Sequence, residues 1–248
     1  EIFNKYNLGS MHHIRINSSF DGFIKSGLGS SGSAAVALIA GLHKNLGKKL
    51  NRYAIAEEAW NIEVNKLLWY GGKQDQYASA FGGLNLIEFG KSVDVMPFTK
   101  EDAENLSEWM MLFYIGNRRE SKIIQAGFKE LTGKQKQALN QIKKRVNIVK
   151  TWIELDYIEG VGEMLNEVWK FKKASNKGVS NAKIDAIYKM ALKSGASGGK
   201  ILGAGGGGYM MFICNPNDQE ELIKKMLEKG IERVDFSPDF GGVEARIL

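Results

Sequence analysis

The chain has 248 residues, 44% of them hydrophobic, and its 34 basic and 28 acidic residues give a net charge of +6. This content is enough to bury a core in one large or two small domains, which excludes a disordered chain. The single cysteine, Cys214, excludes an intrachain disulfide and a cysteine-based zinc cluster, and fits a reducing compartment. No apolar run reaches about 18 residues, and basic residues are interspersed with acidic ones. We therefore expect a cytoplasmic protein that binds neither membrane nor nucleic acid.

A strand is predicted first, at about 12–20, where Ile14 and Ile16 alternate with polar residues. A segment rich in glycine and serine then spans Gly27 to Ser33 and leads into a predicted helix that ends near Leu46. Free backbone N–H groups at a helix start, with the helix dipole, attract anions and above all phosphate. The alternative is a helix with an ordinary serine cap after a flexible turn.

The next predicted helix starts after Asn51, and most glutamates on it are expected to be solvated. A second segment framed by glycines runs from Gly71 to Gly83, with the polar quartet Lys73-Gln74-Asp75-Gln76 between apolar flanks. Such a quartet usually faces a cavity or a ligand. The alternative is an exposed turn in which Asp75 caps a short helix.

Two strands follow, at 84–89 and 93–98, and a domain boundary is expected near residue 105. The second half opens with a buried strand at 110–115. Helices are predicted at 121–131, 134–157, 160–174 and 181–194, and apolar residues at helical spacing support the long one at 134–157. The ending is predicted as a strand, a glycine-rich hairpin and the strand 209–214, followed by a helix at 218–229 and strands near 231–236 and 243–248. Together these elements predict an α+β fold with an antiparallel sheet.

Glycines at 203, 205 and 208 formally match a dinucleotide-binding fingerprint. That fingerprint requires a following helix, whereas Tyr209 to Cys214 reads as a strand, so the glycines are interpreted as a hairpin at which a backbone or a phosphate comes close. No Walker A sequence or protein-kinase signature is present.

Three segments in this order resemble the superfamily of galactokinase, homoserine kinase, mevalonate kinase and phosphomevalonate kinase. The segment Gly27-Leu28-Gly29-Ser30-Ser31-Gly32-Ser33 is similar to its phosphate-binding motif, and Lys200 to Gly208 is similar to its C-terminal glycine motif. Within this superfamily the chain looks most like bacterial D-glycero-D-manno-heptose 7-phosphate kinases, through Gly72 to Tyr77, Trp169 to Lys173 and Gly198 to Gly208.

The resemblance implies a two-domain α+β kinase that uses ATP and Mg²⁺. Residues 1–105 would form a ribosomal-protein-S5-like domain and residues 106–248 a ferredoxin-like domain, with ATP and substrate between them. The resemblance also implies the following site residues. The residues implied to contact ATP are Gly27, Gly29, Ser30, Ser31, Gly32, Ser33, Gly205, Gly206 and Gly207. Ser31 and Glu63 are implied to bind magnesium, and Asp75 with Lys73 to act in catalysis. Gln74, Gln76 and Arg118 are implied to contact the substrate.

In the implied reaction, Asp75 accepts or orients the proton of the acceptor hydroxyl, and the nearby Lys73 keeps that carboxylate ionised. The implied product is a heptose 1,7-bisphosphate, made on the route to nucleotide-activated heptose for surface polysaccharide. A substrate that already carries a phosphate needs a further cationic cluster, for which Arg118, Arg119, Lys172 and Lys173 are candidates.

Family members have a sugar-contacting segment before the strand at 12–20, so we expect the chain to be truncated at its N-terminus. A kinase for galactose, fucose or mevalonate, or a non-catalytic nucleotide-binding module, remains an alternative. A homodimer is compatible with the sequence.

Overall fold

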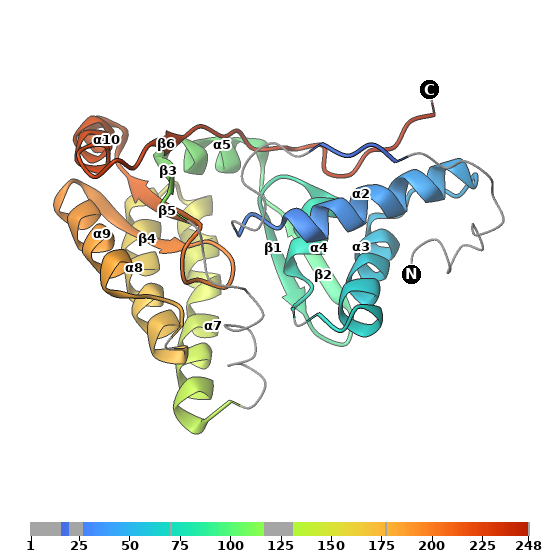
Figure 1. Cartoon of the computed structure of the whole chain (residues 1–248), viewed down its shortest axis with the longest axis horizontal. Helices are drawn as coiled ribbons and strands as arrows, with labels where there is room; N and C mark the ends of the chain where they lie inside the picture. The colour runs from blue at the N-terminus through green and yellow to red at the C-terminus, as the bar shows by residue number, and fades with distance from the viewer. Residues whose placement is uncertain (1–15, 20–26, 70, 117–130, 177, 248) are drawn as a thin grey trace. The chain divides into compact units, whose positions relative to one another are not determined.

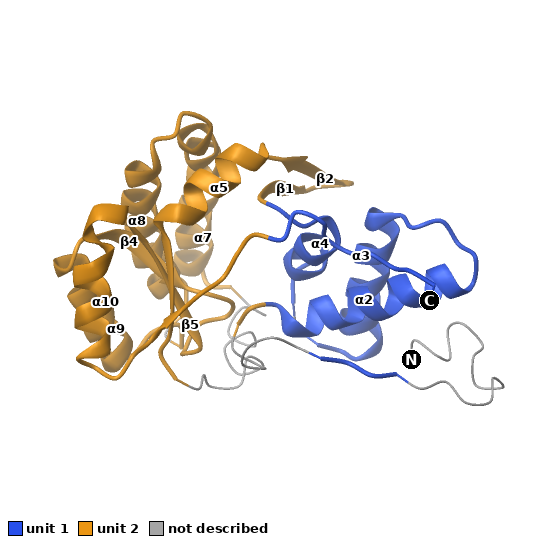
Figure 2. Ribbon diagram, turned by 90° about the horizontal axis from the view of Figure 1, so that it is seen from above, with its two compact units in different colours: residues 1–24, 29–83, 239–248 blue, residues 25–28, 84–238 orange. Residues whose placement is uncertain are grey.

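The computed structural model describes residues 16–19, 27–69, 71–116, 131–176 and 178–247 (Figure 1). The chain divides into two compact units (Figure 2). Unit 1 comprises residues 1–24, 29–83 and 239–248, and unit 2 comprises residues 25–28 and 84–238. Residue 105 lies inside helix α5 (Lys100–Trp109), and a domain boundary there stays a prediction.

Unit 1 is built on helices α2 (Ser30–Asn45), α3 (Arg52–Asn61) and α4 (Gln74–Phe81), and each of them contacts the other two (Figure 1). A short π-helix, η2 (Ile62–Lys66), continues α3. Residues buried in this unit include Val36, Ile39, Ile55, Ala59 and Tyr77. The four described residues of the strand predicted at 12–20, residues 16–19, have no strand structure.

The ends of the helices follow local rules. The side chain of Asn51 accepts a hydrogen bond from the backbone N–H of Ala54 at 3.1 Å, which confirms the predicted cap of α3. At the other end of α2, Gly47 has φ +70°, as expected for a glycine that ends a helix. The start of α2 differs from the alternative prediction of a serine cap, because its N-cap is Gly29, which has no side chain to bond the first turn.

Unit 2 contains a four-stranded sheet in the order β4-β5-β3-β6, and all its paired strands are antiparallel. Its strands are β3 (Met110–Tyr114), β4 (Ala196–Ile201), β5 (Tyr209–Cys214) and β6 (Arg233–Val234). A separate antiparallel hairpin consists of β1 (Asn85–Phe89) and β2 (Val93–Pro97). The predicted antiparallel sheet and the strand on each side of the glycine segment are thereby confirmed.

The helices of unit 2 are α5, α7 (Gly133–Glu154), α8 (Ile158–Ser175), α9 (Ala182–Lys193) and α10 (Gln219–Leu227), with a 3₁₀ turn at η3 (Pro216–Asp218). Sequence reasoning missed α5, which begins with a capping box between Thr99 and Asp102. The helix predicted at 121–131 falls outside the described residues except at its last position. The strand predicted at 243–248 is wrong, since residues 243–247 have no strand structure and Val243 N–H donates to the Ala80 carbonyl of unit 1.

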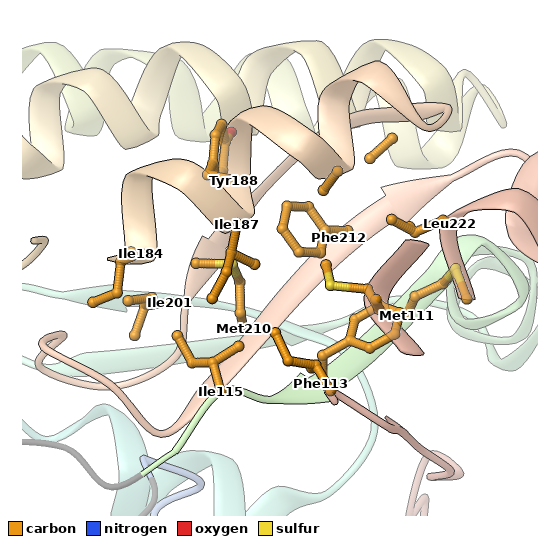
Figure 3. Close-up of a cluster of buried hydrophobic side chains, with 14 of the residues drawn as sticks. Met111, Phe113, Ile115, Ile184, Ile187, Tyr188, Ile201, Met210, Phe212 and Leu222 are labelled. Atoms are coloured by element: carbon orange, nitrogen blue, oxygen red, sulfur yellow. The ribbon is translucent and has the colours of Figure 1, made fainter. Parts of the chain in front are cut away.

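The core of unit 2 lies on both sides of β5. Phe212 packs with Phe113, Met111, Tyr188 and Leu222 in one cluster (Figure 3), whereas the adjacent Ile213 belongs to a second cluster with residues of α5, α7 and α8. Successive strand residues point to opposite faces, so neighbouring side chains enter different clusters. Helices packed on an antiparallel sheet make unit 2 an α+β structure, which confirms the predicted fold class.

Helix α8 approaches β4 closely. A Cβ atom added to Gly198 would collide with the carbonyl oxygen of Gly162 on α8. The two glycines therefore allow backbone to lie against backbone, which leaves no room for side chains between helix and strand. None of the helices within the described ranges is both long and apolar enough to cross a lipid bilayer.

Candidate active site in unit 1

The first turn of α2 holds Ser30, Ser31, Gly32 and Ser33, so the serine-rich segment is itself the helix start. Ser33 N–H donates to the Gly29 carbonyl at 3.0 Å, and Ser33 Oγ donates to the Ser30 carbonyl at 3.2 Å. The N–H groups that precede this first bond have no partner within the helix. Ser31 is exposed, so this positively polarised end of α2 is accessible from solvent at that residue.

Asp75 lies directly beside this helix start. A Cβ atom added to Gly29 would lie 3.5 Å from Asp75 Cγ and 3.8 Å from Asp75 Oδ2. A Cβ atom added to Gly32 would lie only 3.1 Å from Asp75 Cβ. The structure thus brings together, within unit 1, an exposed carboxylate and the helix start that the sequence predicted to hold phosphate.

The polar quartet does not form the turn that the alternative prediction described. Lys73 is the N-cap of α4, and Asp75 lies in the first turn of this helix rather than capping it. Gln74 and Asp75 are exposed, and Gln74 Nε2 donates to Asp75 Oδ1 at 3.2 Å. Gln76 points into unit 1 and is buried.

Lys73 binds a carboxylate other than that of Asp75. Its Nζ donates to both carboxylate oxygens of Glu57, at 2.6 and 2.9 Å, and lies 4.1 Å from the ring centroid of Trp60. Glu57 and Trp60 are three residues apart on α3, so both lie on the helix face turned to Lys73. The predicted effect of Lys73 on the charge of Asp75 stays a prediction.

Tyr77 on α4 also forms a hydrogen bond with Glu57. Its hydroxyl donates to Glu57 Oε2 at 3.1 Å, and its side chain is buried. Burial first, and then the hydrogen bond and negative charge of Glu57, raise the pKa of Tyr77 to about 12. The phenol therefore keeps its proton, and remains a donor to Glu57, throughout the neutral range.

Glu63 is buried in η2, and Gln76 Nε2 donates to its Oε2. The expectation that most glutamates of this region are solvated is wrong, because Glu63 is buried and the side chain of Glu58, whose Oε2 lies 3.3 Å from His43 Nε2, is 11% exposed. Glu57 is partly exposed, but it too has the partners given above. These partners come from elsewhere in the chain, where local sequence does not indicate them.

The residues expected to hold magnesium, Ser31 and Glu63, offer oxygen ligands, which suit this hard cation. The buried Oε1 of Gln76 has no hydrogen-bond partner in the described part of the chain and adds a further oxygen close to Glu63. Among the described residues, no three His, Cys, Asp or Glu side chains are grouped as a complete protein-built metal site. A nucleotide-borne Mg²⁺ needs only one or two protein ligands, so this donor set is compatible with it.

The second glycine segment lies in unit 2. Gly205, Gly206 and Gly207 have φ values of +104°, +78° and +139°, which side chains rarely adopt. Gly206 N–H donates to the Val179 carbonyl at 2.9 Å, and a Cβ atom on Gly205 would lie 2.9 Å from Val179 Cα. The loop is therefore fixed against Val179, and the Gly206 amide already has an acceptor.

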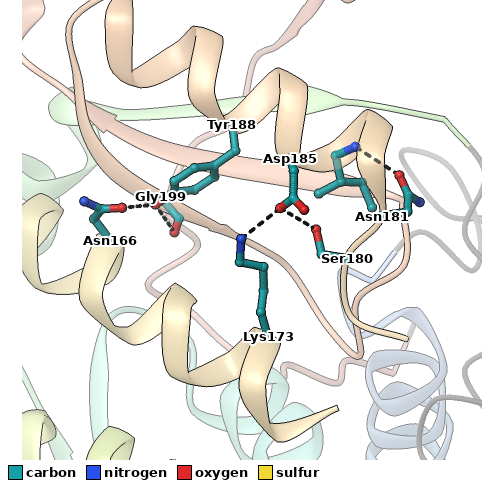
Figure 4. Close-up of polar contacts among 8 residues, drawn as sticks. Asn166, Lys173, Ser180, Asn181, Asp185, Tyr188 and Gly199 are labelled. Atoms are coloured by element: carbon teal, nitrogen blue, oxygen red, sulfur yellow. Dashed lines mark hydrogen bonds and ion pairs between the residues drawn. The ribbon is translucent and has the colours of Figure 1, made fainter. Parts of the chain in front are cut away.

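The two lysines proposed for a second phosphate differ in their surroundings. Lys173 Nζ donates to Asp185 at 2.9 Å, and Ser180 Oγ donates to the same oxygen (Figure 4). Although burial would raise the pKa of Asp185, these hydrogen bonds bring it below its usual range. Burial, and then the charge of Lys200, lower the pKa of Lys172. Arg118 and Arg119 lie outside the described residues.

Sequence reasoning missed Glu57 and Trp60 as neighbours of the quartet. Nothing in the local pattern links them to Lys73, which follows Glu57 by 16 residues. The burial of Gln76 had a signal in the sequence, namely its spacing of one helical turn from the apolar Ala80. Both residues face the interior of unit 1.

Two models of protein families match separate parts of the chain. Residues 1–83 match GHMP kinases N terminal domain, and residues 156–232 match GHMP kinases C terminal. The chain is 34% identical over 226 residues to the D-glycero-alpha-D-manno-heptose 7-phosphate kinase of Campylobacter jejuni, covering 89% of this chain and 67% of the relative. It is 30% identical to the mevalonate kinase of Pyrococcus furiosus, covering 80% of this chain and 59% of that protein.

A solved structure is also similar. The crystal structure of a D-glycero-D-manno-heptose 1-phosphate kinase from Bacteroides thetaiotaomicron superposes with a TM-score of 0.70 at 25% identity, covering 96% of this chain and 68% of that one. The family matches and the similar proteins thus define the class, a small-molecule kinase that is a phosphotransferase with an alcohol group as acceptor. The chain belongs to the GHMP kinase family, as its sequence predicted.

Proposed function

We propose that this chain is the ATP-dependent kinase of a sugar phosphate, and that it phosphorylates the anomeric hydroxyl of D-glycero-D-manno-heptose 7-phosphate to the 1,7-bisphosphate. The placement of Asp75 against Gly29 and Gly32 supports the proposal, since a carboxylate proposed as proton acceptor lies beside the helix start proposed to hold phosphate. The heptose kinase names of two relatives support the sugar class. This product would serve the synthesis of nucleotide-activated heptose.

In the proposed mechanism, the backbone amides of the first turn of α2 hold phosphate oxygens of ATP. The carboxylate of Asp75 takes the proton of the acceptor hydroxyl, or orients it, as the hydroxyl oxygen forms its bond to the γ-phosphorus. The bond from the γ-phosphorus to the bridging oxygen breaks, and ADP leaves with that electron pair. When bound, Mg²⁺ would neutralise phosphate charge, and Ser31 and Glu63 are its proposed ligands.

The remaining residues have supporting roles in this proposal. Gly27, Gly205 and Gly207 are assigned to ATP through the family resemblance alone. Gln74 is exposed beside Asp75, which suits a contact to the acceptor sugar. For Gln76, which is buried against Glu63, we propose that it orients this glutamate and reaches substrate only through it.

A substrate panel tests the proposal. ADP release is measured with ATP, Mg²⁺ and one acceptor at a time: heptose 7-phosphate, galactose, fucose or mevalonate. Turnover that is highest with heptose 7-phosphate supports the proposal. Preference for mevalonate or fucose would assign the chain to the alternative kinases, which the similarity to mevalonate kinases keeps open. ATP binding without turnover of any acceptor would identify a nucleotide-binding module.

The variant Asp75→Asn tests the assigned proton acceptor. We expect turnover to fall on the order of 10²-fold or more, with ATP affinity by calorimetry unchanged. The amide keeps the size of the carboxylate, so the contact with Gly32 is retained. Full turnover in this variant would exclude Asp75 from the reaction.

A further inference from the structure

The carboxylate of Glu57 joins two residues of α4 to α3. It accepts from Lys73 Nζ at 2.6 and 2.9 Å and from the Tyr77 hydroxyl at 3.1 Å. Lys73 and Tyr77 are four residues apart, at the N-cap and in the second turn, so they lie on the same face of α4. One side chain therefore fixes this face of α4 at two levels along the helix.

Packing around Glu57 strengthens this connection. The ammonium of Lys73 lies over the ring of Trp60 at 4.1 Å, and this indole also comes from α3. The ring of Tyr77 contacts the rings of Tyr53 and Phe81 at centroid distances of 6.2 Å each. Since the side chain of Lys73 is 27% exposed and that of Glu57 44%, the ion pair alone contributes little to stability. Its main effect is geometric.

Asp75 lies between Lys73 and Tyr77 in the sequence, two residues from each. At 100° per residue it points to the side of α4 opposite to them, and this side meets Gly29 and Gly32 of α2. Helix α4 is thus bound to α3 on one face and presents Asp75 to α2 on the other. The rotation of α4 about its axis decides where the carboxylate stands.

We propose that Glu57 is a positioning residue, which sets the rotation of α4 and thereby holds Asp75 at the start of α2. The inference rests on the proposed function, in which Asp75 meets the acceptor hydroxyl. A side chain end lies about 5–6 Å from the helix axis, so a rotation of about 10° displaces it by about 1 Å. A displacement of this size can cost about 10²-fold in rate.

The test compares Glu57→Gln with Glu58→Gln, the next residue of α3, whose carboxylate oxygen lies 3.3 Å from Nε2 of His43 on α2. The introduced glutamine would keep the size of the Glu57 side chain but lose its charge and one acceptor oxygen. We expect the Glu57 variant to lower kcat by about 10- to 100-fold, with KM for ATP within about threefold, and the Glu58 variant to retain wild-type kcat. Equal kcat in the two variants would overturn the inference. Tyr77→Phe, which keeps the ring packing, should lower kcat to a smaller extent.

The double variant Glu57→Gln, Asp75→Asn separates positioning from a general structural effect. If Glu57 acts through Asp75, the double variant has the turnover of Asp75→Asn alone. If turnover fell from Asp75→Asn to the double variant by the same factor as it falls from the wild type to Glu57→Gln, Glu57 would act elsewhere and the inference would be overturned. If Asp75→Asn itself left turnover unchanged, the proposed function would fail instead.

A structural readout does not need turnover. Amide hydrogen exchange of residues 73–81 should be faster in the Glu57 variant than in the Glu58 variant, because α4 has lost its connection to α3. Identical exchange in both variants would overturn the inference even in a chain that turns over no acceptor.

Discussion

Replacing Gly32 by alanine perturbs the contact between α2 and α4 at its closest point. The added Cβ would lie 3.1 Å from Asp75 Cβ and 3.4 Å from both Asp75 C and Gln76 N. Non-bonded carbon atoms prefer about 3.5–4.0 Å, so the two helices must separate by about 0.4–0.9 Å. In rigid packing this overfilling costs about 1–3 kcal/mol, of which the better helix propensity of alanine offsets about 1 kcal/mol.

Gly41 on the same helix provides the matched control. It is exposed, and a Cβ atom added there meets no atom within 4 Å. Gly41→Ala should therefore raise the free energy of unfolding by about 0.5–1 kcal/mol, whereas Gly32→Ala should leave it unchanged or lower it by up to about 2 kcal/mol. Urea unfolding of both variants measures the difference.

Turnover should separate the two variants further. A shift of Asp75 by about half an ångström is expected to reduce kcat about tenfold, and Gly41→Ala should keep wild-type kcat. The assay is ADP release with the preferred acceptor of the substrate panel. If Gly32→Ala were as stabilising as Gly41→Ala and fully active, α2 and α4 would not meet at Gly32, and the argument for the site would be refuted.

Three further predictions concern stability. Gly198→Ala should destabilise unit 2 by about 3 kcal/mol or more, since its Cβ would collide with the Gly162 carbonyl; thermal unfolding close to that of the wild type would contradict this. Asn51→Ala should cost about 1 kcal/mol in urea unfolding through loss of the cap at Ala54, and no change would show that the cap contributes nothing. Burial, and then the charge of Asp218, raise the pKa of Cys214 from 9.0 to about 11. The stabilising contribution of this thiol is complete below about pH 9 and is lost as the pH rises towards 11, so Cys214→Ala should lose less stability than the wild type over that range.

Local sequence predicted the elements well where a few neighbouring residues decide the backbone. The position of Asn51 predicts the cap of α3, apolar spacing predicts α7, and helices are also predicted where α8 and α9 lie. Helix α5 is not predicted although Thr99 and Asp102 form its capping box, because the charged residues at 99–104 favour a domain boundary near residue 105 in the sequence analysis. The prediction of a terminal strand is wrong because residues 243–247 join no strand, and the N–H of Val243 donates to the carbonyl of Ala80 in the last turn of α4.

The sequence by itself determined the glycine segments, the order of most of the elements and, through them, membership of the GHMP kinase family. Only the tertiary structure decided that Asp75 stands against Gly32, that Lys73 binds Glu57, and that Gln76 turns inward to Glu63. The physical reason is the distance along the sequence over which each kind of interaction acts. Capping and periodicity act within about one helical turn, whereas these contacts depend on how α2, α3 and α4 pack and join residues that are 13 to 43 positions apart in the sequence.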